Sequence, residues 1–482
     1  MQFPNTAGGR VPTARVIGAV AVSLVMLTIA GCGDAANGES ELQSPETQSA
    51  VPRTAVTMAA EAVTSGLFDD SAVHNLAISF AQDDYDDMIA TFSASSEKDW
   101  IDATVTIDGV TYADVGLRLK GNSSIMGLRR DGDTGRMGGG ATADTPEALP
   151  WLVDLDRNVD GQNHEGIVEF VVRSNTSTTA LNEAVALQLL EEAGLASQDA
   201  VAVRFSVNGS QPTLRLVIEN PDDVWMAERF DGGGALYKAE STGDYSYRGD
   251  DPDLYDEVFD QEAGKDNADL TPLIGFLEFI NNADEATFAA QLGDHLDIDA
   301  FASYLAMQEL LANFDDIDGP GNNSYLYYDP KAGMFTVVPW DHNLAFGAMG
   351  AGMGGVRQPD GVQLPDGAQL PGGVRDAGGG QAPIRGGQPG GREIQPGGGA
   401  NGAGRGMSRS NILVERFRAN PEFAALYEQR LTELRAQLYG SGVAEGILEK
   451  WVSLLTTQAS DLVDRSTIER EAAGVTAYFA AP

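Results

Sequence analysis

Residues 313–327 read NFDDIDGPGNNSYLY, and residues 338–347 read VPWDHNLAFG. The first stretch follows a long apolar region and combines acidic residues with Gly, Pro and Asn, which is typical of a loop at the end of a helix. Two short apolar runs, 324–328 and 334–339, predict a hairpin that leads from this loop to the second stretch.

This hairpin predicts a cluster of oxygen-bearing side chains. Its strands are short and antiparallel, so Asp341 is expected close to Asp315 and Asn323. Two carboxylates and an amide oxygen form a hard site that suits Mg²⁺ or Mn²⁺. Phosphoryl transfer uses the same parts, because one Asp receives the proton of the acceptor hydroxyl while an Asn and a second Asp bind metal. The alternative is that residues 315–323 form a solvated turn.

The remaining patterns predict an α+β protein, with antiparallel hairpins in the N-terminal part and a mainly helical C-terminal part. Asp108-Gly109 and Asn208-Gly209 separate apolar runs and predict tight hairpin turns. From the apolar periodicity, strands are expected at 74–80, 103–107, 115–119, 168–173, 201–207 and 214–219, and helices at 83–92, 181–193, within 269–311, at 417–438 and at 447–468.

The N-terminal segment predicts export. Arg10 and Arg15 precede an apolar run over residues 16–30, which is too short for a membrane span. The run ends in Ile-Ala-Gly-Cys32, which resembles the lipobox of bacterial lipoproteins, and Cys32 is the only cysteine of the chain. Residues 1–32 are therefore expected to be a lipoprotein signal peptide, with acylated Cys32 holding the protein to a lipid bilayer at the cell surface or in the periplasm. The alternative is an ordinary signal peptide that contains a cysteine.

The rest of the chain is expected to form one domain with an insertion. Residues 33–70 are rich in Ser, Thr, Glu, Gln and Ala and predict a flexible tether. The domain then covers residues 71–347. Gly, Pro, Arg, Gln and Asp dominate residues 348–407, which predicts a disordered insertion. Residues 408–482 are expected to supply helices that complete the domain.

The composition is strongly acidic, with a net charge of −40 and an isoelectric point of about 4.2. This charge opposes binding to nucleic acid and to anionic lipid, so nucleic acid is not expected as a partner. It suits a protein outside the cell or one that collects divalent cations, although a salt-adapted proteome explains it equally well.

Four motifs, taken in their order along the chain, resemble the CotH kinase family, the spore coat protein H type. They are GLRLKGNSS at 116–124, LYK at 236–238, the acidic loop and strand at 313–327, and WDHN at 340–343. The resemblance implies an atypical protein-kinase-like fold. It also implies transfer of phosphate from ATP to Ser or Thr of proteins with the help of a divalent metal.

The resemblance assigns roles residue by residue. Asp315 matches the catalytic aspartate, Asp341 the metal-binding aspartate after the hairpin, and Asn323 a second metal ligand. Lys120 and Lys238 match family lysines, which can meet phosphate oxygens as point charges. Surface solubility is the alternative role for each lysine.

Three further residues complete the predicted nucleotide site. Asn122 and Ser123 lie in the segment 121–124, which offers backbone N–H groups and hydroxyls to an anion or forms a tight turn. Glu219 matches a family glutamate that pairs with a lysine; otherwise it is an exposed charge at a strand end. Many family members carry a lysine on the strand after this segment, where the present chain reads LPWLVDLD at 149–156.

Residues 156–161, DRNVDG, begin like a calcium-binding loop. The twelfth position counted from Asp156, which is a glutamate in such a loop, is Ile167, and Glu165 comes too early. A Ca²⁺ site and a plain turn are both open at this stretch.

Together these features predict an exported, metal-dependent phosphotransferase with Asp315 as base, ATP as donor and a Ser- or Thr-bearing surface protein as substrate. Because ATP is scarce outside the cytoplasm, the alternative is a noncatalytic surface module that keeps the fold and a metal site and binds protein or glycan. A third alternative is a calcium-stabilised structural lipoprotein.

Overall fold

The computed structural model describes residues 66–128, 142–230, 233–240, 243–265, 268–320, 322–348 and 411–480. All of them belong to the second of the two units into which the chain divides, residues 59–482. The predicted signal peptide with Cys32, most of the tether and nearly all of the insertion lie outside the described residues. Within the described ranges, no helix combines the length and the apolar character that a bilayer span requires.

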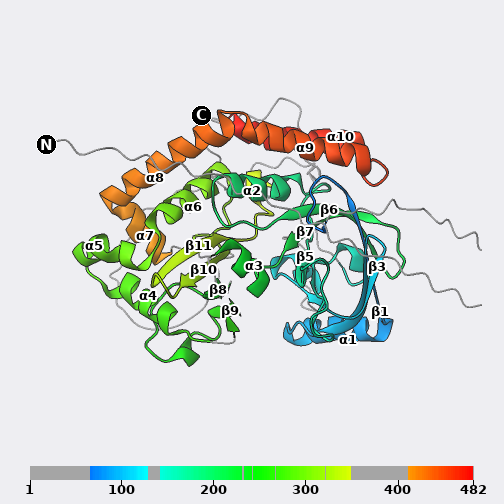
Figure 1. Ribbon diagram of the computed structural model, residues 1–482, viewed down its shortest axis with the longest axis horizontal. Coiled ribbons are helices and arrows are strands. Elements are labelled where there is room, and N and C mark those ends of the chain that lie inside the picture. Colours follow the sequence, from blue (N-terminus) through cyan, green and yellow to red (C-terminus); the bar gives the residue numbers. More distant parts are fainter. Residues whose placement is uncertain are drawn as a thin grey trace, which may run out of the picture. The chain divides into compact units, whose positions relative to one another are not determined.

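Seven strands of the N-terminal part close into a barrel (Figure 1). β1 pairs antiparallel with β2 and parallel with β6, and this parallel pair closes the ring. Alternate side chains point inward, and fully buried residues such as Val105 and Leu117 fill the interior. In their order around the barrel, the strands are β1 (His74–Phe80), β2 (Ile101–Ile107), β3 (Val110–Leu119), β4 (Trp151–Asp154), β5 (Glu169–Val172), β7 (Thr213–Glu219) and β6 (Ala200–Val207).

Two tight turns connect hairpins of the barrel at the positions that the sequence predicts. Asp108 and Gly109 have φ values of 45° and 87°, and Asn208 and Gly209 have φ values of 48° and 77°. Two consecutive left-handed residues give a turn whose twist matches that of the flanking strands, and Asp-Gly and Asn-Gly adopt it at little cost. The first turn joins β2 directly to β3, whereas the second lies at the start of the loop 208–212 between β6 and β7.

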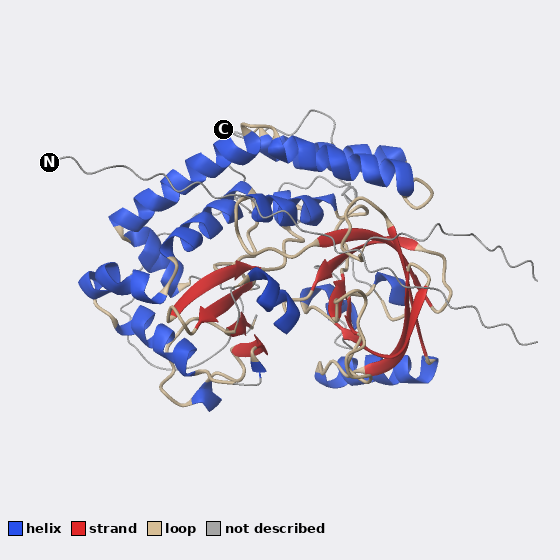
Figure 2. Ribbon diagram, viewed as in Figure 1, coloured by secondary structure: helices blue, strands red, loops and turns tan. Residues whose placement is uncertain are grey.

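A second sheet has four strands in the order β11-β10-β8-β9, and Figure 2 shows it as a group of arrows separate from the barrel. β10 (Ser324–Asp329) and β11 (Met334–Pro339) form the predicted hairpin, with Ser324 opposite Pro339. β8 (Ala235–Ala239) pairs with β10 on its other side, and β9 (Phe259–Ala263) pairs with β8.

Helices pack around this second sheet and along the barrel (Figure 1). α2 and α6 are buried on nearly all sides, which explains why both are rich in Leu and Ala. α9 and α10 lie against α2, and α8 lies against α6. The helices are α1 (Gln82–Ser95), α2 (Leu181–Glu192), α3 (Asp223–Arg229), α4 (Thr271–Asn282), α5 (Glu285–His295), α6 (Ile298–Leu310), α7 (Ile412–Ala419), α8 (Pro421–Leu434), α9 (Val443–Gln458) and α10 (Arg465–Phe479).

The predicted α+β class and the hairpins are confirmed, but several details differ. The single helix predicted at 447–468 is wrong, because α9 ends at Gln458 and α10 begins after Asp464, whose side chain accepts from the Thr467 N–H at 2.9 Å and caps the new helix. The sequence did not predict β8 and β9, which are short and mix polar with apolar residues. Packing also begins before residue 71, since Leu67 is fully buried.

Candidate functional site

The loop after α6 brings Asp315 and Asn323 together. Asn323 Nδ2 donates to the carbonyl oxygen of Asp315 at 2.9 Å and to its carboxylate Oδ2 at 3.1 Å. The loop closes tightly on itself, because a Cβ on Gly319 would lie 2.6 Å from the Asp315 Cα and only glycine fits there. The two oxygen-bearing residues are thus held side by side by the loop.

Asp341 leaves the sheet at the same edge as this loop. Ser324 pairs with Pro339, so Asn323 precedes one strand of the hairpin at the edge where Asp341 follows the other. Asp341 has a φ of 59°, an unusual conformation for a residue with a side chain. Its carboxylate is 27% exposed and forms an ion pair with Nη2 of Arg173. The carboxylate is therefore both restrained and open to solvent.

Arg173 is a site residue that the sequence did not reveal. It follows β5 directly and also binds Glu183 of α2, with Nε donating to Oε2 at 3.1 Å and Nη2 lying 2.8 Å from Oε1. Burial alone would lower the pKa of Arg173, but Asp341 and Glu183 raise it well above its ordinary value. The sequence signal that could have revealed Arg173 is its place as a single arginine at the end of an otherwise apolar strand.

The backbone beyond Asp341 is held by the same region of the chain. Thr176 Oγ1 donates to the carbonyl oxygen of Asn343 at 2.7 Å, and Asn182 Nδ2 donates to it at 2.6 Å. Thr176 lies in the β5–α2 loop, and Asn182 lies in the first turn of α2. Together with Arg173, these contacts attach the Asp341 segment to the start of α2.

A buried polar network links the two acidic segments through α6. Gln308 Nε2 lies 3.1 Å from His342 Nε2, and Gln308 Oε1 accepts from Asn313 Nδ2 at 2.9 Å. Burial lowers the pKa of His342 to about 4, so this imidazole is neutral near pH 7 and its Nε2 accepts from the amide. The side chain of Gln308 thus fixes the position of Asn313 relative to His342. Asn313 lies two residues before Asp315, and His342 directly follows Asp341.

The two predicted lysines also lie near the hairpin. Lys238 is opposite Tyr325 of β10, and its Nζ is 3.0 Å from Glu240 Oε1. Lys120 is almost fully buried, with Nζ 5.8 Å from the ring centre of Trp340, the neighbour of Asp341. Burial lowers the pKa of Lys120 to about 8, with the nearby Arg118 and Lys238 acting in the same direction and Glu262 opposing them.

Lys98 joins this basic cluster, although the sequence did not suggest it. It lies in the loop between α1 and β2, and its Nζ donates to Asn122 Oδ1 at 2.9 Å. Burial lowers the pKa of Lys98 to about 8, and the positive charges of Arg118, Lys120 and Lys238 contribute. The predicted Asn122 is therefore oriented by a lysine. The side chain of Ser123 is outside the described part of the structure.

Glu219 pairs with an arginine and not with a lysine. Its Oε2 accepts from Arg229 Nη2 at 2.7 Å and from the Asp199 N–H at 2.8 Å. Burial, followed by the charge of Asp199, raises the pKa of Glu219 to about 7 even though Arg229 opposes the shift. This side chain therefore ties the end of β7 to α3.

The donor set fits a hard divalent cation in its chemistry. Asp315, Asn323 and Asp341 provide carboxylate and amide oxygens, the ligands that Mg²⁺ and Mn²⁺ prefer. Among the described residues, no group of three or more His, Cys, Asp or Glu side chains is arranged as a metal centre. Asp315 and Asn323 contact each other, whereas Asp341 is related to them only through the pairing of the hairpin and faces Arg173. A cation shared by all three residues stays a prediction.

The segment of the predicted calcium loop is held by other contacts. The guanidinium of Arg157 lies 3.9 Å from the ring centre of Trp100, and Asn158 Nδ2 donates to Asp102 Oδ1 at 2.9 Å. These contacts attach the segment to Trp100 and to β2. A calcium ion here stays a prediction.

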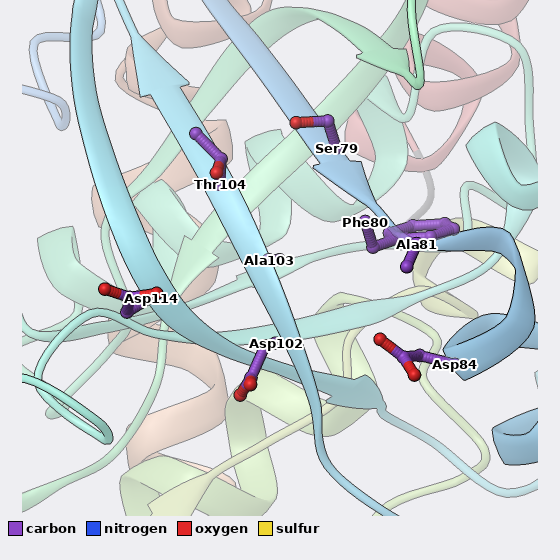
Figure 3. Close-up of a pocket in the computed structure, with 8 residues that line it drawn as sticks. All are labelled: Ser79, Phe80, Ala81, Asp84, Asp102, Ala103, Thr104 and Asp114. Carbon is purple, nitrogen blue, oxygen red and sulfur yellow. The ribbon is translucent and has the colours of Figure 1, made fainter.

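Two surface hollows lie on the barrel, away from Asp315 and Asp341. The first, of about 370 Å³, is drawn in Figure 3 and has three carboxylates in its wall, from Asp84, Asp102 and Asp114. Figure 3 shows these carboxylates well separated, on different elements, without a common centre. The second hollow, of about 490 Å³, lies beside α1. Neither coincides with the cluster described above.

Comparison with known proteins agrees with three of the four sequence motifs, since GLRLKGNSS at 116–124 precedes the matched residues. Residues 139–467 match the family described as CotH kinase protein, which is more than half of the chain. The chain belongs to the CotH family. The inner spore coat protein H of Bacillus subtilis (strain 168) is 26% identical over 171 residues, which cover 34% of this chain and 45% of that protein. The similarity thus spans less than half of that relative.

Proposed function

We propose that this protein is a metal-dependent phosphotransferase with an atypical protein-kinase-like fold. The observation that carries the proposal is the link from Arg173 to both Glu183 and Asp341. In protein kinases, a strand cation pairs with a glutamate of the following helix beside a metal-binding aspartate, and all must be in place for catalysis. Here the strand is β5, the helix is α2, and the aspartate follows the β10–β11 hairpin.

The reacting groups follow from this arrangement. Asp315 receives the proton of the acceptor hydroxyl, while Asn323 keeps its carboxylate oriented through the 3.1 Å hydrogen bond. Asp341 and Asn323 would hold Mg²⁺ or Mn²⁺, which supplies charge neutralisation at phosphate oxygens when bound. Lys120 and Lys238 contact the phosphates of ATP.

Lys98 and Asn122 support the phosphate contacts from the loop before β2 and the segment after β3. Asn122 accepts from Lys98 at 2.9 Å, so the ammonium group of Lys98 lies beside the predicted 121–124 segment. The basic cluster is notable in a chain of net charge −40, because such a chain would otherwise repel a polyphosphate.

The proposed acceptor is a Ser or Thr of an exported protein. Support comes from the relative, which is named a spore coat protein, and from the predicted lipoprotein signal peptide. Lipid attachment at Cys32 would place the site at a membrane surface, where only neighbouring proteins are within reach of it.

The test is transfer of γ-phosphate to a Ser-rich protein, or to the chain itself, in the presence of Mg²⁺ or Mn²⁺. Asp315→Asn should abolish labelling without changing the melting temperature by more than a few degrees. Asp256→Asn, at an exposed position of the same chain, is the matched control and should label normally. Absence of both nucleotide binding and labelling in the unaltered protein would overturn the proposal.

A second candidate is a noncatalytic surface module that binds protein or glycan. It differs from the first candidate in the role of the Arg173–Asp341 ion pair, which here only joins the two sheets' segments while Asp341 takes up no metal. If the protein binds a surface partner but never labels any protein, this second function replaces the first.

A further inference from the structure

The C-terminal helix α10 contacts the loop that leads into α2. Glu471 Oε2 accepts from the N–H of Thr179 at 2.9 Å and from its hydroxyl at 2.5 Å, and Oε1 accepts from the Thr178 N–H at 3.1 Å. One carboxylate therefore satisfies three donors that are 292 or 293 residues earlier in the chain.

The start of α2 is capped by hydroxyls of the preceding loop, which this contact holds in place. Ser177 Oγ accepts from the Ala180 N–H at 3.0 Å. The residue at the N-cap position is Ala180, which has a φ of 53° and no side-chain hydrogen bond to the helix. The hydroxyl of Thr179, which Glu471 engages, accepts in turn from the Leu181 N–H at 3.3 Å. A negative charge near a helix N-terminus is also stabilising. Glu471 thus holds the backbone and the hydroxyl of Thr179, the residue whose side chain caps the start of α2.

The loop that Glu471 holds carries the groups that restrain Asp341. It begins directly after Arg173, the partner of Asp341, and contains Thr176, which binds the Asn343 carbonyl. It ends at α2, where Asn182 binds the same carbonyl. Any displacement of the loop would therefore move the contacts on both the side chain of Asp341 and the backbone that follows it.

The same helix also packs on the chain downstream of Asp341. The ring of Phe346 lies 5.8 Å from that of Tyr478 and 5.9 Å from that of Phe479. Phe346 and Gly347 both have positive φ values, 55° and 64°, so this short turn is sterically defined where α10 covers it. α10 therefore touches the restraining loop on one side of Asp341 and the turn on the other.

We propose that α10 is a clamp that positions Asp341 for metal binding, with Glu471 as its positioning residue. The role in metal binding rests on the proposed function. The mechanical role of α10 as a clamp rests on the contacts described above. Glu471 touches neither the site nor its ligands; it acts through the β5–α2 loop, Arg173 and Asn182.

The first experiment measures hydrogen–deuterium exchange of the full chain. Glu471→Gln keeps the shape of the side chain but weakens its three hydrogen bonds, so exchange in peptides covering 174–185 and 341–348 should rise about five- to tenfold. The matched control is Glu469→Gln on the same helix, whose exposed carboxylate pairs with Arg465 at 2.7 Å, and it should leave both peptides unchanged. Unchanged exchange in Glu471→Gln overturns the clamp.

The second experiment measures phosphate labelling at increasing Mn²⁺. Glu471→Gln should raise the half-saturating Mn²⁺ concentration about five- to tenfold while the rate at saturating Mn²⁺ changes less than twofold, as expected when positioning of a ligand is lost. If exchange rises but the Mn²⁺ dependence does not move, the helix is structural only and the positioning role is overturned.

Two further outcomes separate this inference from the proposed function. If the unaltered protein labels nothing while Glu471→Gln still loosens both peptides, the phosphotransferase fails and the clamp stands. If Glu471→Gln does not fold, Thr179→Val, which removes one of the three donors, takes its place and should show the same pattern at about half the size. A folded Thr179→Val without any rise in exchange overturns the clamp.

Discussion

Arg173 and Asp341 form an ion pair although 168 positions separate them in the chain. Arg173 ends a barrel strand, whereas Asp341 follows a hairpin of the second sheet. Glu183 completes the arrangement from α2, so three segments meet at one guanidinium.

Arg173→Met should cost about 3–5 kcal/mol of unfolding free energy at pH 8, because it leaves Glu183, which is 2% exposed, as a buried and uncompensated charge. Burial already raises the pKa of Glu183, and without Arg173 it rises further, so the carboxylate binds a proton and the loss shrinks towards pH 5. Urea denaturation at the two pH values measures this.

The matched control for that variant is Arg465→Met, which breaks an exposed pair with Glu469 and should cost under about 1 kcal/mol. Arg173→Met with Glu183→Leu should recover part of the loss, since both buried charges are then gone. A loss below about 1 kcal/mol for Arg173→Met at pH 8 would contradict the importance of this ion pair.

Gln308→Leu should destabilise the protein by about 2–4 kcal/mol. It removes the hydrogen-bond partner of two buried atoms, Nε2 of His342 and Nδ2 of Asn313. Thermal or urea unfolding provides the measurement. Gln429→Leu, at an exposed glutamine that binds Glu433 on its own helix, serves as the control and should change stability by no more than about 0.5 kcal/mol. Equal effects of the two substitutions would refute the network.

Binding of inorganic tripolyphosphate should weaken as the pH rises through about 8, where Lys120 and Lys98 lose their protons in the unliganded protein. If only the ammonium form binds, the dissociation constant rises up to about tenfold per pH unit for each lysine involved. Calorimetry between pH 7 and pH 9.5 measures the slope. Lys120→Arg, which stays charged over this range, should reduce the slope, and an unchanged slope would exclude Lys120 as a phosphate ligand.

A rise in pH that weakens phosphate binding through Lys120 should increase the stability of the folded protein through the same residue. Its pKa is lower in the folded protein than in the unfolded chain, so the unfolded chain binds more protons between about pH 8 and the ordinary lysine pKa. The contribution of Lys120 to the unfolding free energy therefore increases with pH in this window. Comparing the pH dependence of unfolding of the unaltered protein with that of Lys120→Met isolates this contribution.

Gly347→Ala should destabilise the turn after Asp341 by about 1–3 kcal/mol. The residue has a φ of 64°, and an added Cβ would collide with the hydroxyl of Tyr478 on α10. Tyr478→Phe removes that hydroxyl and leaves the ring carbon Cζ, 3.2 Å from the new Cβ, as the nearest contact. The double variant should thus be more stable than Gly347→Ala alone in thermal unfolding, and the reverse order would disprove the contact.

Much of the local structure was predictable from short patterns. Asp108-Gly109 and Asn208-Gly209 specify their own turns because two left-handed residues leave the chain few other choices. The acidic loop brings Asp315 and Asn323 together because Gly319 allows the backbone to close within a few residues. Signals of this kind depend on neighbours in the chain, and the same holds for the family motifs that point to CotH.

The positions of Arg173, Lys98 and Glu471 could not be predicted in this way. Each is a common surface residue by type, and only the packing of distant segments gives it a role: beside Asp341, beside Asn122, and at the loop before α2. The parallel pairing of β1 with β6, which closes the barrel, belongs to the same class. Such contacts join segments more than a hundred residues apart in most cases, and no local periodicity encodes them.

The amino-acid sequence alone therefore determined the family, the hairpins and which oxygen-bearing side chains share the acidic loop, since short-range sterics and turn chemistry are written in neighbouring residues. The tertiary structure alone decided which cation faces Asp341 and which helix holds the loop behind it. The physical reason is that a buried charge needs an opposite charge close to it in space, and the fold can supply that partner from a segment far away in the sequence.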